Sequence, residues 1–122
     1  MPHGTSNRLV EYAREHIGNA LRTVAVIYEN DCEVIYLRED LQTAYDPEQY
    51  KSVAESFRTD LGLAAHVTGE SPVGGKQAII HQHDSAFVFQ FPHEDCHSIL
   101  MSVDPEVGSQ LRSFASECQQ QI

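Results

Sequence analysis

The chain has 122 residues, of which 18 are Asp or Glu and eight are Lys or Arg, so its formal net charge at pH 7 is −10 with histidine neutral. A chain of this length fits one domain with one hydrophobic core, and its acid excess repels polyanions such as nucleic acid. The six arginines are dispersed, whereas nucleic-acid binding needs them clustered. We therefore expect a single domain over residues 1–122 that does not bind nucleic acid.

Composition also predicts where the protein works. Apolar runs are only a few residues long, so neither a membrane-spanning helix nor a signal peptide is expected. The three cysteines are too few, and odd in number, for a disulfide framework, which predicts reduced thiols and a cytoplasmic protein. An acidic surface with only two lysines is favoured in a high-salt cytoplasm, because carboxylates hold hydrated cations, and we expect a halophilic source.

The first predicted element is a helix over residues 6–18. Val10, Ala13 and Ile17 recur at helical spacing, and Gly18 supplies a C-terminal stop. Two β runs follow, over residues 21–28 and 32–37, and the turn residues between them predict a hairpin. Both runs carry apolar residues on both faces, which predicts strands in the middle of a sheet, covered on each side.

The clearest helix start in the chain lies at Asp46. An Asp cap is followed by Pro47 at the first helical position and by Gln49 three residues after the cap, which is the pattern of a capping box. The helix is expected to end near Gly62, and residues 68–75 read as a flexible connection. Its predicted apolar row consists of Tyr50, Val53, Ala54, Phe57 and Leu61.

Residues 76–103 alternate with a period of two, which predicts a three-stranded meander. Phe87, Phe89 and Phe91 share one face of the middle run. A second Asp-Pro-Glu helix start at Asp104 opens a last helix, whose apolar row is predicted to reach the core. That row consists of Val107, Leu111, Phe114 and Cys118.

The predicted element order is therefore α-β-β-α-β-β-β-α, a single α+β domain with a five-stranded antiparallel sheet and helices packed on it. The core is expected to contain Val26, Phe57 and Phe114. This order resembles the roadblock and longin-type domains, which are related in layout to profilin-like sensor folds. The resemblance implies a dimeric, non-enzymatic scaffold and a protein partner such as a small GTPase.

A second resemblance rests on three short runs. They are Leu-Val-Glu-Tyr-Ala-Arg at residues 9–14, Tyr-Leu-Arg-Glu-Asp at 36–40 and Phe-Pro-His at 91–93. The chain is similar in these runs to an uncharacterised family of short haloarchaeal proteins. That family implies no activity for these residues.

Histidines supply the candidate chemistry, in two clusters around His81 and His83 and around His93, Cys96 and His97. Imidazole, thiolate and carboxylate groups are suitable ligands for zinc. In a meander the clusters lie at opposite ends of one strand, roughly 20 Å apart at about 3.3 Å per residue. They cannot share one ion within a chain, so each would bind zinc alone or with ligands from a second subunit.

Several alternatives compete with a metal site. The polar clusters can be solvated turns, which is the interpretation that sequence favours. Cys96 beside His93 or His97 can be read as a nucleophile pair, although no orienting Asn or Asp is identified. Residues 69–76 superficially resemble a phosphate-binding loop, but the lysine is one place too late and a strand follows instead of a helix.

Self-association is the main functional expectation. Residues 99–101 are consecutive apolar residues in a run predicted to form an exposed edge strand, so Leu100 would need cover on the opposite side of the sheet. A second subunit could supply it by strand pairing or through Leu9, Tyr12 and His16 of the first helix. We therefore expect a homodimeric, non-enzymatic protein-interaction module of roadblock-like type, the alternative being a histidine- and cysteine-based metal-binding protein or metalloenzyme.

Overall fold

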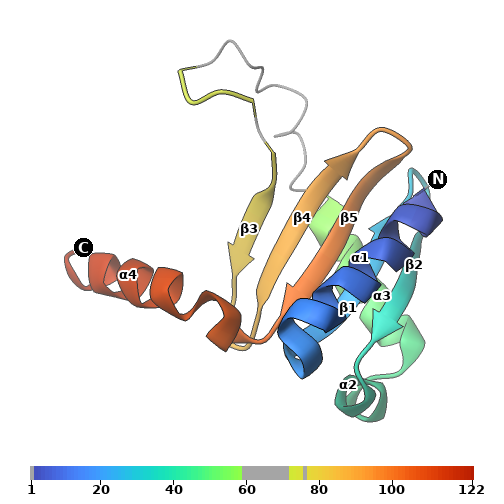
Figure 1. Cartoon of the computed structure of the whole chain (residues 1–122), viewed down its shortest axis with the longest axis horizontal. Coiled ribbons are helices and arrows are strands. Elements are labelled where there is room, and N and C mark those ends of the chain that lie inside the picture. Colours follow the sequence, from blue (N-terminus) through green and yellow to red (C-terminus); the bar gives the residue numbers. More distant parts are fainter. Residues whose placement is uncertain (1, 59–71, 76) are drawn as a thin grey trace.

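A computed structural model describes residues 2–58, 72–75 and 77–122. It contains a five-stranded antiparallel sheet with the strand order β2-β1-β5-β4-β3 (Figure 1). The predicted hairpin and meander are both confirmed, and so is the α+β class. The strands are β1 Leu21–Ile27, β2 Cys32–Leu37, β3 Ile79–Gln82, β4 Phe87–His93 and β5 Cys96–Val103.

Within these ranges four α-helices accompany the sheet, one more than predicted. The additional helix, α2, is only six residues long and offers a single buried apolar side chain, Leu41, so it has no periodic pattern to detect. Two short 3-10 turns, η1 Gly18–Ala20 and η3 Pro105–Gly108, join helices to strands. The helices are α1 Pro2–Ile17, α2 Glu39–Ala44, α3 Pro47–Glu55 and α4 Ser109–Gln120.

The capping box at the start of α3 forms as predicted. The Gln49 backbone N–H donates to Asp46 Oδ1 at 2.8 Å, and the Asp46 N–H donates to Gln49 Oε1 at 3.0 Å. Pro47 occupies the first turn, where a missing N–H costs nothing. The predicted continuation of this helix to Leu61 lies outside the described residues.

One face of the sheet packs against α1. Val24, Val26, Ile99 and Val103 form a buried cluster on this face together with Ala13 of the helix. Because residues directly opposite one another in an antiparallel pair share a face, the pairing of Val26 with Ile99 and of Val24 with Met101 aligns these side chains in rows across the strands. The prediction that Val26 lies in the core is confirmed.

The other face packs against α3 and the residues that follow it. Ala25, Val88 and Leu100 are buried there against Ala54 and Phe57, so the predicted core position of Phe57 is confirmed. The two helices thus lie on opposite sides of one sheet.

Buried polar side chains run across the α3 face of the strands. Thr23 Oγ1 and Ser102 Oγ are hydrogen-bonded at 2.5 Å between β1 and β5. The Gln90 amide nitrogen donates to Ser98 Oγ at 3.2 Å and to the Phe57 carbonyl at 3.2 Å. We call Thr23, Gln90, Ser98 and Ser102 the polar row.

Two predictions about strand position are wrong. β5 lies between β1 and β4 rather than at an edge. Leu100 is only 4% exposed, because Ala54 of α3 and Phe57 pack on the same face of the sheet. Leu100 therefore needs no second subunit to cover it. β2 is an edge strand instead of a central one, because the connection from α2 and α3 leads to the other side of the sheet.

The predicted core position of Phe114 is also wrong. α4 extends away from the sheet, and Phe114 is 66% exposed (Figure 1). Within the part of the chain that the structure describes, no residue of α4 is buried. The last helix begins at Ser109 rather than after Asp104, so Val107 of the predicted row lies in η3 and only Leu111, Phe114 and Cys118 lie in α4, where the domain does not bury them.

Candidate functional site

Apolar side chains are incompletely covered on the α1 face, over the strands that α1 does not reach. Ile80 pairs with Phe89, Phe89 with Met101, and Met101 with Val24, so the four side chains form one row across four strands. Exposure rises along it, from 0% at Val24, which lies under α1, to 50% at Ile80. A sheet face with exposed large apolar side chains is typical of an interaction surface.

A second aromatic ring extends this region along β4. The rings of Phe89 and Phe91 are stacked, with centroids 6.3 Å apart and planes 6° from parallel. Tyr12 and Leu9 of α1 form the rim of the adjoining groove, and Tyr12 is 62% exposed. We call Ile80, Phe89, Phe91 and Met101, with the rim residues Leu9 and Tyr12, the open face.

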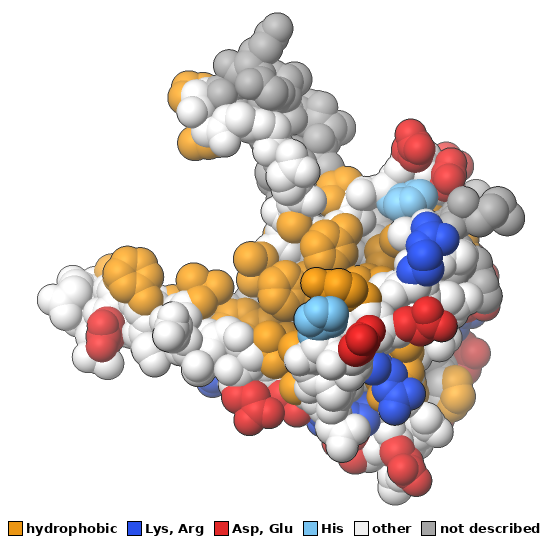
Figure 2. All heavy atoms as spheres, in the orientation of Figure 1, with side chains coloured by type: hydrophobic (Ala, Val, Ile, Leu, Met, Phe, Trp, Pro, Cys, Tyr) orange, Lys and Arg blue, Asp and Glu red, His pale blue; other side chains and the backbone are white. Residues whose placement is uncertain are grey.

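A row of apolar residues on η3 and α4 continues this surface. Val107, Leu111 and Phe114 are all exposed, and Val107 also lines the groove beside the open face. Figure 2 shows apolar side chains gathered over the middle of the sheet, with further apolar side chains along the projecting helix. The residues of α4 include only one base, Arg112, and one acid, Glu117, so the helix is neutral in a chain of net charge −10.

The base of α4 is held firmly. The Asp104 N–H donates to the Ala20 carbonyl at 2.8 Å. Gly108 lies so close to the buried Phe87 ring that a Cβ at this position would stand 2.7 Å from a ring carbon. Because Phe87 fills the core below it, η3 cannot shift without disturbing that packing.

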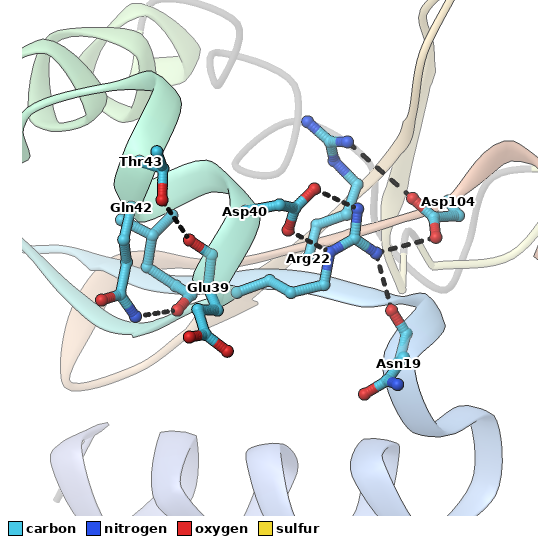
Figure 3. A network of polar contacts seen from close by, with 9 residues as sticks. Asn19, Arg22, Glu39, Asp40, Gln42, Thr43 and Asp104 are labelled. Carbon is cyan, nitrogen blue, oxygen red and sulfur yellow. Dashed lines mark hydrogen bonds and ion pairs between the residues drawn. The ribbon is translucent and has the colours of Figure 1, made fainter.

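Asn19, Asp40 and Asp104 belong to a polar network (Figure 3) that Arg38 joins together at this same end of the sheet. Its guanidinium donates to the Asn19 carbonyl at 2.6 Å, to Asp40 Oδ1 at 2.7 Å and to Asp104 Oδ2 at 2.7 Å. These hydrogen bonds to Asp40 and Asp104 raise the pKa of Arg38. The bond from Arg38 also lowers the pKa of Asp40. Arg22 adds an ion pair to Asp104 at 3.8 Å, and the whole network is structural in character.

The predicted metal ligands His81 and His83 lie together on the α3 face. Their ring centroids are 6.5 Å apart, and each ring makes a T-shaped contact with the Phe57 ring. His81 Nε2 is 2.8 Å from Gln90 Oε1, which engages one ring nitrogen in the polar network. The two histidines are therefore neighbours, packed on an aromatic ring.

The second predicted cluster lies at the far end of β4, in the β4–β5 hairpin. His93 Nδ1 accepts the Asp95 N–H at 3.1 Å, and His93 pairs with Cys96 across the turn. Burial, with a smaller effect of Arg58, lowers the pKa of His97. In the described ranges no group of three or more His, Cys, Asp or Glu side chains gathers as a metal site. Zinc binding at either cluster stays a prediction.

The thiol of Cys96 is poorly placed for nucleophilic chemistry. Burial is the largest cause that raises its pKa, and the charge of Asp95 raises it further, so the thiol form is favoured. A reactive cysteine needs the opposite environment, with a cationic neighbour that stabilises the thiolate.

Sequence reasoning missed a pocket on the α3 face. A cavity of about 200 Å³ lies between α3 and strands β1, β4 and β5, with Arg22 and Thr23 in its wall. A β-bulge between Leu21 and Thr23 turns the side chains of Arg22 and Thr23 to this side. The bulge is evident only from the strand pairing. Arg22 Nε is buried without a hydrogen-bond partner among the residues that the structure describes. Phe57, also in the wall, is followed by only one more residue before the undescribed range begins.

Comparison with protein families gives one match. The model described as "Domain of unknown function (DUF7522)" matches residues 7–122. The chain belongs to this family. Curated proteins and solved structures gave no match. Family membership thus accounts for nearly the whole chain as one unit but names no activity, and function has to be inferred from the surfaces described above.

Among the helices of the described residues, none is long and apolar enough to cross a bilayer. Exposed apolar side chains of this member of the family include Ile80 of the sheet and Leu111 and Phe114 of α4. That arrangement can bind a protein surface.

Proposed function

We propose that this protein is a non-enzymatic, homodimerising interaction module, and that a second copy of the chain covers its open face. The observation that carries the proposal is the row from Val24 to Ile80, which is fully buried under α1 and half exposed at β3. Burying such side chains contributes roughly 25 cal/mol for each Å² removed from water, so the uncovered half of the row favours association.

The distribution of charge also favours association through the open face. Two chains that each carry −10 repel one another over most of their area. The groove beside the open face is lined by apolar residues and His16, and none of its lining residues is acidic. The open face is therefore where two copies can approach with little charge repulsion, and a twofold dimer is the commonest closed arrangement of identical chains.

The cellular setting and a second partner class are further parts of this proposal. The described cysteines Cys32, Cys96 and Cys118 are free thiols, which is consistent with the reducing cytoplasm that we propose as its location. The resemblance of the element order to roadblock and longin-type domains is the basis for naming a small GTPase as a second class of partner.

Sedimentation equilibrium at micromolar concentration in molar potassium chloride tests the proposal. The wild-type chain should have twice the chain mass of 13.7 kDa. Tyr12→Asp places a charge at the rim of the open face and should shift the protein to monomer, because the charge would be buried on association. Tyr45→Asp is the matched control, since Tyr45 is also exposed but lies at the end of α2. A wild-type monomer under these conditions would overturn the proposal.

A further inference from the structure

We propose that the two copies of the dimer exchange their C-terminal helices, so that α4 of each copy lies on the open face of the other, beside α1. This inference rests on the proposed homodimer and names the element that fills its interface. Among the residues that the structure describes, each chain presents a partly uncovered sheet face and an uncovered amphipathic helix, and the exchange would cover both in both copies. Two such contacts related by a twofold axis form a closed dimer without leftover surfaces.

The first step of the argument is that the helix has one apolar side. Val107, Leu111, Phe114 and Cys118 are spaced by four, three and four residues, which places them on one side of a helix. None of the described residues of α4 is buried, so this side is unused within its own domain. A helix this short gains most of its stability from packing that side against a partner surface.

The second step is the fit between helix and face. The 12 residues of α4 span about 18 Å at about 1.5 Å per residue. The seven residues of β4 span about 23 Å at about 3.3 Å per residue. One helix of this length can cover the exposed ends of the Ile80–Phe89–Met101 row and the Phe91 ring next to it, which is the region α1 leaves open.

The third step concerns which copy supplies the helix. Gly108 packs on Phe87, and Asp104 is bonded to Ala20 and Arg38, so the chain that leads into α4 is held in place. From this fixed base the helix points away from its own sheet (Figure 1). Covering its own open face would require α4 to turn back over the sheet from this base. A second copy meets α4 without any such change.

Charge permits the contact. Neither the apolar row of α4 nor the lining of the groove beside the open face includes an acidic residue. The two charged residues of α4, Arg112 and Glu117, are of opposite sign. The exchange thus brings together a neutral helix and a groove without acidic lining residues, which limits repulsion between two chains of net charge −10.

Complementation between two variants tests the exchange. Phe114→Asp damages the helix, and Phe91→Asp damages the open face. Each variant alone should be monomeric at concentrations where the wild type is dimeric, because neither helix–face contact is intact. Mixed together, they should form a heterodimer, since the intact helix of the Phe91→Asp chain can bind the intact face of the Phe114→Asp chain.

Native mass spectrometry of the mixture, with one variant isotopically labelled, measures the heterodimer directly. The dissociation constant of the heterodimer should be at least tenfold larger than that of the wild-type dimer, because only one of the two helix–face contacts remains. Ser113→Asp is the matched control, since it adds the same charge on the opposite side of α4 and should leave the wild-type dimer unchanged. Leu111→Ser, which adds no charge, should weaken the dimer in the same direction as Phe114→Asp, and circular dichroism should give a wild-type spectrum for every variant.

The outcomes separate the two proposals. If the wild type is dimeric and the single variants Phe114→Asp and Leu111→Ser are both as dimeric as the wild type, the homodimer stands and helix exchange is wrong. A dimeric wild type whose two damaged variants form no heterodimer also overturns the exchange. A monomeric wild type overturns both proposals.

Discussion

The first and last helices of this chain have the same kind of sequence pattern and opposite surroundings. α1 and α4 each carry apolar residues on one side, but α1 lies on the sheet whereas α4 extends away from it (Figure 1). In α1 the row packs into the core through Ala13, whereas among the described residues of α4 no side chain is buried. An amphipathic pattern predicts that a helix will be covered, but it does not say whether its own domain or another copy covers it.

The largest difference should appear when the same charge is placed on each helix. Ala13→Asp buries a carboxylate in the core, where Ala13 is 5% exposed, and should reduce the free energy of unfolding by about 3 kcal/mol or more. Phe114→Asp should change the monomer's free energy of unfolding by less than about 1 kcal/mol, as exposed positions usually do. Urea denaturation at low protein concentration measures both. Equal losses would mean that α4 packs within its own chain.

Arg38 links the end of α1 to the start of α4, and its removal should loosen both. Arg38→Met loses bonds to the Asn19 carbonyl and to the carboxylates of Asp40 and Asp104. Hydrogen bonds to charged groups contribute about 1.5–3 kcal/mol each when fully made, and we expect a loss of about 2–3 kcal/mol because the site is partly exposed. Thermal unfolding measures it, with Arg8→Met on the exposed side of α1 as the control.

The sign of the pH dependence follows from the same pair. Arg38 holds the pKa of Asp40 below its ordinary value of 3.8. The stabilisation from this carboxylate is therefore complete above pH 3.8 and is lost as the pH falls through its lower value in the folded protein. The stability difference between wild type and Arg38→Met should shrink in that range and be constant above it.

A smaller effect should come from Gly108, at the base of α4. Gly108→Ala places a methyl group about 2.7 Å from the Phe87 ring, whose buried position leaves it no room to move. We expect a loss of about 1–2 kcal/mol, typical of overpacking. Gly4→Ala in α1, where a Cβ meets nothing within 4 Å, should be neutral or slightly stabilising. Similar results for the two variants would mean that the base of α4 is free to move.

The smallest effect concerns salt. Molar potassium chloride should raise the melting temperature of the wild type, because it screens repulsion among the carboxylates of a chain with net charge −10. Glu11→Gln in α1 removes one acid and should reduce this salt dependence slightly. Ser113→Gln in the neutral α4 should not alter it. A melting temperature that falls with salt would contradict the electrostatic account.

How much of this structure the sequence predicts depends on whether a feature arises from neighbouring residues or from residues far apart in the chain. The Asp46 cap, the turn between β1 and β2, and the alternation of Phe87, Phe89 and Phe91 depend on neighbouring residues, and each was predicted correctly. Strand order depends on partners far apart in the chain. For that reason Leu100 was wrongly assigned to an edge strand, although it lies in the centre of the sheet.

The candidate site was predicted less well than the fold. Tyr12 and Leu9 were singled out as contact residues, and they do rim the open face. The face itself follows from the cross-strand alignment of Ile80, Phe89 and Met101, which no local pattern encodes. Phe114 was wrongly placed in the core because a helical row carries no information about the direction in which its helix leaves the sheet.

The polar row has a consequence for how the chain reaches this fold. Thr23 Oγ1 meets Ser102 Oγ, and the Gln90 amide meets Ser98 Oγ, in the observed alignment of β1, β4 and β5. Sliding β5 by one residue would turn Ser98 and Ser102 to the opposite face and break both bonds, a cost of about 1–3 kcal/mol for each buried group left unsatisfied. A strand that contains Ile99, Leu100 and Met101 in succession could otherwise pair almost equally well in neighbouring registers. The hydroxyl and amide groups therefore disfavour misaligned strand pairings during folding.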